Sequence, residues 1–289
     1  MIYRFIAIAI ISLFVIFTPS TVGAADPIGK GLAISPLRQE VTLDAGKTTK
    51  GMFTVSNLTN KPMLVNMSVK QFSATNYIYD YEFRPPDNDW VKLQVPQVQL
   101  QPGESRKISY DVILPPKVAP GGYYYTVFVS TDIDSGLPST VQAATLIYLT
   151  VNGDLIRTSL LQNDSIPFWV TGTNIPYKFD VKDTGNVHFS AYFYGQLEGI
   201  FGKLPESGTS HIVMPGTVRT IEGVIPSPLL PGIYRVTYGY KVDFADFVVA
   251  KSAWIIFIPP WSVVVLVFLL IGARWGYIKW RNRTKNKEK

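Results

Sequence analysis

An uninterrupted apolar stretch near the C-terminus constrains this chain more than any other feature. It runs from Trp254 to Ala273, about twenty residues without an ionised side chain. A helix of that length, at about 1.5 Å per residue, covers the roughly 30 Å of bilayer hydrocarbon. The alternative is a buried apolar helix followed by a solvated basic tail. We predict a transmembrane helix over residues 253–278, because both of its ends carry residues that favour a bilayer interface.

The residues that flank this stretch predict its orientation. Aromatic side chains favour the boundary between lipid and water, and basic residues gather on the cytoplasmic side. Residues 279–289 hold six of the chain's lysines and arginines. We therefore expect a single-pass cell-membrane protein with extracellular N-terminal domains, a basic cytoplasmic tail at 279–289 and the lipid bilayer as a partner. The predicted membrane-interface residues are Trp254, Trp261, Arg274, Trp275, Tyr277 and Trp280.

The N-terminus has the pattern of a secretory signal peptide. Arg4 precedes an apolar run from Phe5 to Phe17, which is too short for an ordinary span. Small residues at Gly23 and Ala25 suit a signal-peptidase site, so residues 1–25 are predicted to be removed. The chain has no cysteine, which fits a bacterial exported protein that is stabilised by core burial instead of disulfides.

The formal net charge of +6 does not indicate a nucleic-acid partner. Seven of the 27 basic residues lie from Arg274 onward and one is Arg4, which leaves 19 basic against 20 acidic residues between them. The predicted extracellular part is therefore close to neutral, and its sequence contains no basic patch. The tail's charge is explained by topology and by anionic lipids of the inner leaflet.

Between the two apolar segments the sequence alternates apolar and polar residues in short runs. Gly51–Ser56 and Met63–Lys70 are examples, and Gly, Pro, Asn and Asp separate the runs. No stretch keeps the 3.6-residue period of an amphipathic helix. Several short strands at this spacing predict a β-sandwich.

The second half of this region repeats the first. Three pairs of segments match in the same order: Phe53–Asn60 with Phe179–Asn186, Pro102–Ile108 with Pro215–Ile221, and Pro115–Tyr123 with Pro226–Tyr234. We therefore predict an all-β fold of two tandem Ig-like or fibronectin-III-like β-sandwiches plus one C-terminal transmembrane α-helix. The first sandwich is expected over residues 26–153 and the second over residues 154–252.

An aromatic row suggests a binding surface in the first sandwich. Tyr77, Tyr79, Tyr81 and Phe83 recur at every second position, so in a strand they would share one face. One interpretation is a sheet face that a loop or the second domain covers. The other is an aromatic platform for a ligand. The predicted ligand-binding residues are Tyr77, Tyr79, Tyr81, Phe83 and Trp90, with the Tyr123–Tyr125 strand as a weaker second choice.

Catalytic chemistry finds little support in the sequence. The two histidines, His188 and His211, lack the spacing of a metal site. The sequence also has no Gly-x-Ser-x-Gly motif, which would supply a nucleophilic serine for a histidine base. His188 alternates with apolar neighbours, as a structural histidine does. No coherent set of acid, base and nucleophile is present. We predict that the protein is not an enzyme, with no catalytic residues, no metal site and no cofactor.

Several short segments of the chain together carry a family resemblance. They are Gly31–Pro36, Phe53–Pro62, Gln71–Tyr81, Pro120–Gly122, Asn186 and Pro231–Tyr234. With them the chain resembles the WxL-interacting proteins of Gram-positive bacterial surfaces. The resemblance implies peptidoglycan binding by the first domain and partner binding by the second. It predicts a non-catalytic, membrane-anchored cell-surface protein that binds cell-wall peptidoglycan or another surface protein. The alternative is a structural subunit of a larger membrane-associated assembly.

Overall fold

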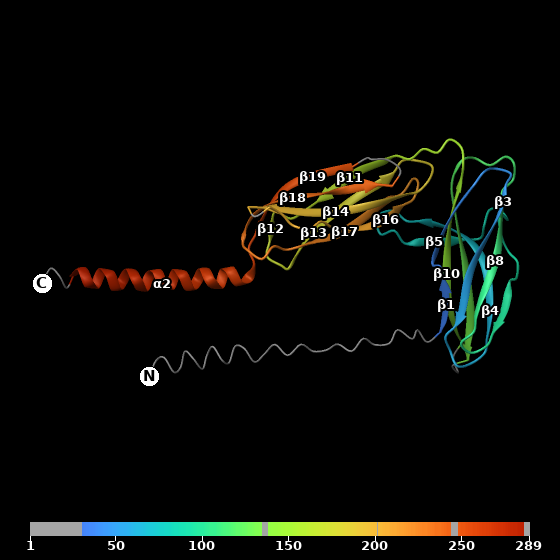
Figure 1. The fold of residues 1–289 in the computed structure, drawn as a ribbon, viewed down its shortest axis with the longest axis horizontal. Helices are drawn as coiled ribbons and strands as arrows, with labels where there is room; N and C mark the ends of the chain where they lie inside the picture. The colour runs from blue at the N-terminus through green and yellow to red at the C-terminus, as the bar shows by residue number, and fades with distance from the viewer. Residues whose placement is uncertain (1–30, 135–137, 201, 244–247, 286–289) are drawn as a thin grey trace.

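The computed structural model describes residues 31–134, 138–200, 202–243 and 248–285. Within them the chain forms two β-sandwiches in succession and one C-terminal helix (Figure 1). The prediction of an all-β chain with two β-sandwiches is confirmed. The predicted signal peptide, residues 1–25, lies outside the described residues, and the predicted domain limits stay predictions.

The first sandwich packs two sheets on one apolar core. One sheet has the strand order β1-β3-β8-β6, and the other has the order β2-β10-β9-β4-β5, with β7 also paired to β4. Inward side chains such as Phe53, Tyr110 and Val127 fill the space between the sheets. The strands are β1 Leu32–Ser35, β2 Arg38–Leu43, β3 Thr48–Asn57, β4 Met63–Ala74, β5 Tyr81–Arg84, β6 Val91–Leu93, β7 Gln97–Leu100, β8 Ser105–Ile113, β9 Gly121–Asp134 and β10 Pro138–Val151.

The second sandwich has its own core and a related arrangement. Its sheets have the orders β11-β13-β17 and β12-β19-β18-β14-β15, with β16 also paired to β14. Phe179, Phe193 and Tyr240 lie at the centre of the core. The strands are β11 Ser159–Ser165, β12 Trp169–Val170, β13 Asn174–Asp183, β14 Phe189–Gly199, β15 Gly202–Lys203, β16 Ser207–Val213, β17 Val218–Pro226, β18 Gly232–Val242 and β19 Val248–Phe257.

Both sandwiches divide their first strand between two sheets. β1 runs antiparallel to β3 in one sheet, and after Pro36 the chain continues in β2, which runs parallel to β10 in the other. The second sandwich repeats this with β11, which pairs with β13, and β12, which runs parallel to β19. The shared topology agrees with the three matched segment pairs of the sequence.

The C-terminal helix α2, Pro260–Lys285, follows β19 after only two residues. Pro260–Trp280 is long and apolar enough to cross a membrane, with a mean hydropathy of 1.8 over its best window. None of that window is buried, which argues against a buried core helix. Residues 253–257, which the sequence assigned to the predicted span, lie in β19 instead.

The aromatic row is not one strand. β5 begins only at Tyr81, and Tyr77 and Tyr79 both have φ of 65°, in the left-handed region. The preceding loop is closed by Thr75, whose N–H donates to the carbonyl oxygen of Asp80 at 2.8 Å. The expectation that Tyr77, Tyr79, Tyr81 and Phe83 alternate on one strand face is therefore wrong. A left-handed non-glycine backbone persists where surrounding contacts hold it, and those contacts come from the second sandwich.

Candidate functional site

Tyr79 lies buried in the joint between the two sandwiches. Its hydroxyl oxygen accepts a hydrogen bond from the backbone N–H of Met214 at 2.6 Å. The guanidinium of Arg219 lies over its ring, 4.1 Å from the centroid. Burial raises the pKa of the Tyr79 hydroxyl well above its ordinary value, so it stays neutral. The ring contacts the second sandwich and is not open to a ligand.

The backbone beside Tyr79 also pairs with the second sandwich. The Tyr77 N–H donates to the Val218 carbonyl oxygen at 2.6 Å, and the Thr220 N–H donates to the Tyr77 carbonyl oxygen at 3.1 Å. The side-chain oxygen of Asn76 accepts from the Val218 N–H at 2.8 Å. This loop therefore extends the edge of β17, while the Tyr77 side chain itself is half exposed.

A second group of contacts completes the joint around His188. The Tyr124 hydroxyl accepts from the His188 backbone N–H at 3.0 Å and lies 3.2 Å from the His188 Nδ1. Burial, reinforced by the charges of Arg157 and Arg38, lowers the pKa of His188 to about 4. The imidazole is therefore neutral near pH 7. Close by, the Gly122 N–H donates to the Asn186 carbonyl oxygen at 2.8 Å.

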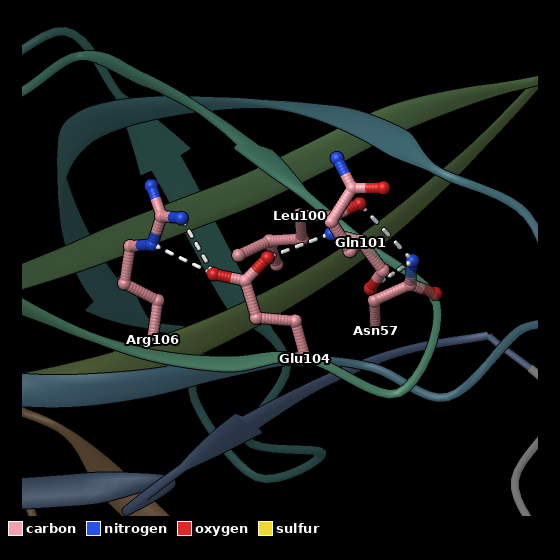
Figure 2. Close-up of polar contacts among 5 residues, drawn as sticks. All are labelled: Asn57, Leu100, Gln101, Glu104 and Arg106. Atoms are coloured by element: carbon pink, nitrogen blue, oxygen red, sulfur yellow. Dashed lines mark hydrogen bonds and ion pairs between the residues drawn. The ribbon is translucent and has the colours of Figure 1, made fainter.

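A turn in the first sandwich has a self-contained polar network (Figure 2). The side-chain amide of Asn57 donates to the carbonyl oxygens of Leu100 and Gln101, at 3.3 and 3.0 Å. The Glu104 carboxylate accepts from the Gln101 N–H at 2.8 Å and from the guanidinium of Arg106. Every contact in this network comes from the same sandwich.

The matching turn in the second sandwich is completed by the first. The sequence repeat aligns Asn57 with Asp183, Gln101 with Met214, Glu104 with Thr217 and Arg106 with Arg219. Thr217 is too short to bind the Met214 N–H as Glu104 binds that of Gln101. The Tyr79 hydroxyl binds it instead, and Arg219 stacks on the Tyr79 ring. Tyr79 of the first sandwich therefore supplies contacts that this turn of the second sandwich does not make within its own domain.

Of the other predicted ligand-binding residues, Tyr81 continues the aromatic cluster of Tyr79, with 6.2 Å between their ring centroids, and Trp90 lies elsewhere. Tyr81 and Phe83 pack with Phe72 on the outer face of the first sandwich, where Phe83 is exposed. Trp90 packs edge-on against Tyr123, 4.8 Å between centroids, and lies half-buried against the core. The structure thus does not bring Trp90 together with Tyr79. The Tyr123–Tyr125 strand alternates faces: Tyr124 points into the joint and Tyr125 into the core.

The open edge of β10 is a feature that the sequence reasoning missed. β10 pairs with β9 along its whole length, from Pro138 to Val151, but with β2 only from Leu146 onward. Among the described residues, no strand pairs with the other side of β10 before Leu146. An open edge presents unpaired N–H and C=O groups to an incoming chain. The edge is open because β10 has 14 residues and β2 has only 6, so β2 covers only part of β10.

The predicted membrane-interface residues lie on β19 and α2. Trp254 is an exposed side chain of β19. The remaining ones, Trp261, Arg274, Trp275, Tyr277 and Trp280, are exposed along α2. Their role at an interface stays a prediction. Within the described ranges, no group of three or more histidine or acidic side chains could hold a metal ion.

Comparisons with known proteins found structural similarity only. No protein-family model matches the chain, and no curated protein matches it. The structure is similar to the class 5 fimbriae chaperone CfaA, with a TM-score of 0.41, 12% identity, and coverage of 79% of this chain and 100% of that one. It is also similar to the E. coli chaperone DraB, with a TM-score of 0.36, 12% identity, and coverage of 77% and 95%.

A third similar structure is a complex of two proteins. This is the CsuC–CsuE chaperone–tip adhesion subunit pre-assembly complex of Acinetobacter baumannii, with a TM-score of 0.40, 10% identity, and coverage of 79% of this chain and 98% of that one. Each of these solved structures spans both sandwiches of the present chain.

These comparisons correct the expectation drawn from resemblance. The similar structures are fimbrial chaperones, and no family model supports a WxL-interacting protein, so that prediction is wrong. The predicted function, a membrane-anchored cell-surface protein that binds peptidoglycan, is wrong for the same reason. The matched segments, such as Phe53–Pro62 and Pro231–Tyr234, are turn and strand signals that many β-sandwiches need. They therefore could not distinguish one family from another.

Proposed function

We propose that this chain is a non-enzymatic protein that binds an extended segment of another protein along the open edge of β10. The observation that carries the proposal is that no described strand pairs with the outer side of β10 at Gln142 and Ala144. Strand addition to a sheet edge supplies affinity through main-chain hydrogen bonds, and alternating side chains supply specificity. We also infer that both sandwiches are of the Ig-like type and that α2 holds them at a membrane.

The direction of the backbone groups on β10 favours this mode of binding. The Leu146 N–H points away from β9, because it donates to the Leu37 carbonyl oxygen at 2.9 Å. In an antiparallel ladder every second residue points its N–H and C=O the same way. Gln142 and Ala144 therefore present these groups at the open side, and a partner strand would continue the line of β2.

The side chains beside this edge offer apolar contacts as well. Ala143 and Leu32 are partly buried against the core of the first sandwich, at the seam where β1 lies against β10. Val141 is also half-buried on the same face of β10 as Ala143. A partner segment with alternating apolar residues would cover this seam while it pairs with β10. Burial of apolar surface would add to the main-chain hydrogen bonds.

The compared complex of CsuC with CsuE joins a chaperone to a pilus tip subunit. For the present chain the proposal depends on the β10 edge alone. The absence of enzymatic activity is proposed because His188 is buried and bonded within the joint, and because the described residues include no group of three or more histidine and acidic side chains that could hold a metal ion.

The proposal can be tested by crosslinking in native cells. A photo-crosslinking residue placed at Gln142 is expected to capture a protein, while the same residue at Leu160, an exposed position on β11, is not. The Ala144→Pro substitution removes an outward N–H and should abolish the crosslink at position 142. The matched Ala144→Ser variant keeps the N–H and should retain it. Equal capture by both variants would contradict strand addition.

A further inference from the structure

We propose that the end of the second sandwich nearest α2 lies in the lipid–water interface of the membrane, with Phe168, Trp169, Leu229, Leu230 and Ile233 in contact with lipid. These five residues are called the apolar end below. The proposal rests on the membrane location proposed above for α2, and it concerns residues of the folded sandwich that lie outside the predicted span.

Three strands place apolar side chains in one row at this end. Ile256 of β19 is paired with Trp169 of β12 on one side and with Ile233 of β18 on the other. Paired residues of neighbouring strands point to the same face of a sheet. The side chains of Trp169 and Ile233 are 60% and 63% exposed, so the row faces outward and not into the core.

The adjoining loops extend this row. Phe168 precedes β12 and packs edge-on against Trp169, with 5.5 Å between ring centroids. Leu229 and Leu230 lie in the loop before β18, and Leu229 is 88% exposed. Single exposed apolar residues need no explanation, but a contiguous group of them marks a surface that contacts a partner or a membrane.

The position of α2 identifies the membrane as that partner. Phe257, the last residue of β19, pairs with Gly232, so the Leu229–Leu230 loop lies beside the point where the chain leaves the sandwich. The Ile258 N–H donates to the Val170 carbonyl oxygen at 2.9 Å, which fixes this exit against β12. α2 begins at Pro260 and extends away from that end (Figure 1). The apolar end is therefore adjacent to the start of the predicted span.

The charges near this end are compatible with a membrane surface. The segments 166–170, 227–235 and 254–260 contain no acidic residue, and their one charged residue is Arg235. Arg235 is exposed and is paired in register with Trp254 on one side and with Glu198 of β14 on the other. A basic residue flanking apolar and aromatic side chains suits anionic lipid headgroups. Aromatic and aliphatic side chains at such surfaces reach about 5–10 Å into the boundary between headgroups and acyl chains.

The chain contains no cysteine, so single labels can be placed without removing native residues. We would prepare four full-length variants, Leu229→Cys, Ile233→Cys, Val248→Cys and Val267→Cys, each with a fluorophore on the thiol. All four positions are exposed, which limits their effect on folding. The proteins would be reconstituted in vesicles of phosphatidylcholine and phosphatidylglycerol, and quenching by spin-labelled lipids would be compared with quenching by iodide.

Val248 is the matched control, because it lies on β19 nine residues before Phe257 and therefore far from the exit. Val267 lies within α2 and reports the span itself. We expect lipid-borne quenching at positions 229 and 233 to exceed that at 248 by about threefold or more, as for side chains at interface depth. Strong quenching at 267 with aqueous behaviour at 229 and 233 would overturn this inference alone. Aqueous behaviour at all four positions would overturn the membrane location as well.

Discussion

The two sandwiches use the same turn, and they differ in what completes it. In the first, Glu104 binds the N–H of Gln101 and pairs with Arg106, so that turn needs no contact from the other sandwich (Figure 2). In the second, the corresponding N–H of Met214 is bound by Tyr79, a residue of the first sandwich. The second sandwich therefore relies on the first for one of its own turns. Two domains of the same fold can thus differ in whether a turn at their contact surface is hydrogen-bonded within its own domain or by the other domain.

A second difference between the turns concerns charge. Asn57 and Asp183 are both buried, and each accepts a hydrogen bond from the N–H two residues on, Thr59 at 2.9 Å and Gly185 at 2.7 Å. The amide nitrogen of Asn57 donates to carbonyl oxygens, whereas Oδ2 of Asp183 has no hydrogen-bond partner within the described residues. Burial raises the pKa of Asp183 to about 7, although the Gly185 N–H partly offsets this shift.

The largest expected effect comes from giving the first turn the acid of the second. In Asn57→Asp, the donor to the carbonyl oxygens of Lys61, Leu100 and Gln101 becomes a carboxylate oxygen that repels them. We expect a loss of about 3 kcal/mol in the free energy of unfolding at pH 8. Urea unfolding of the full chain in detergent micelles would measure it. Part of the loss should be recovered at pH 5, where the new acid can hold a proton.

A control for this prediction lies on the surface of the same sandwich. Asn66→Asp changes an exposed side chain that bonds only to Gln97, so its effect should be within about 0.5 kcal/mol. If Asn57→Asp were equally mild at pH 8, the amide of Asn57 would not be the group that stabilises the turn.

The reverse exchange, Asp183→Asn, should stabilise the protein. Between about pH 4 and pH 7 folded Asp183 keeps a proton that the unfolded chain loses, so stability falls as pH rises through that window. Asparagine removes this dependence, and we expect a gain of about 1–3 kcal/mol at pH 8 and little change at pH 4. Unfolding curves recorded across this pH range would show it.

His188 gives a dependence of the opposite sign and provides an internal check. Its folded pKa of about 4 lies below its ordinary value of 6.5, so its contribution to stability is lost as pH falls from about 6.5 to 4. The Asp183→Asn variant should therefore keep the loss of stability on the acid side. A variant whose pH profile matched the parent would show that Asp183 is ionised in the folded protein.

The smallest effect is expected for Tyr79→Phe. The variant keeps the ring under Arg219 and removes the hydroxyl that binds the Met214 N–H, which should cost about 1–2 kcal/mol because that N–H is buried. Hydrogen exchange at Met214 would report the loss directly. Tyr81→Phe is the matched control, since its hydroxyl contacts only that of Tyr148, at 3.2 Å. Unchanged exchange at Met214 would contradict the dependence of the second turn on the first sandwich.

Much of the fold could be predicted because it depends on local patterns. Alternating runs such as Met63–Lys70 report strands, and the repeated turn segments report a duplicated sandwich. The aromatic row misled because Tyr77 and Tyr79 have the spacing of a strand but the backbone of a loop. The Tyr77 backbone is held by hydrogen bonds to Val218 and Thr220, and the Tyr79 hydroxyl accepts from the Met214 N–H, about 140 residues later in the chain. No local pattern contains that information.

The candidate site at β10 was beyond sequence reasoning for a related reason. A strand edge is open where no neighbouring strand reaches it. β2 starts at Arg38, just after the chain crosses between the sheets near Pro36, and it therefore pairs with β10 only from Leu146 to Val151. The residues at the edge, such as Gln142 and Ala144, have no distinctive chemistry of their own. Aromatic density drew the prediction to the joint, where the rings serve packing between the sandwiches.

The short passage from β19 to α2 has a mechanical consequence. Only Ile258 and Pro259 separate the last strand from the helix, so there is no flexible linker that could extend under a pulling force. A force applied between the first sandwich and α2 runs along β19, which is paired with β18 from Val248 to Phe257. The load is then shared in shear by all the hydrogen bonds of that ladder at once, and a force on the first sandwich is transmitted directly to the helix.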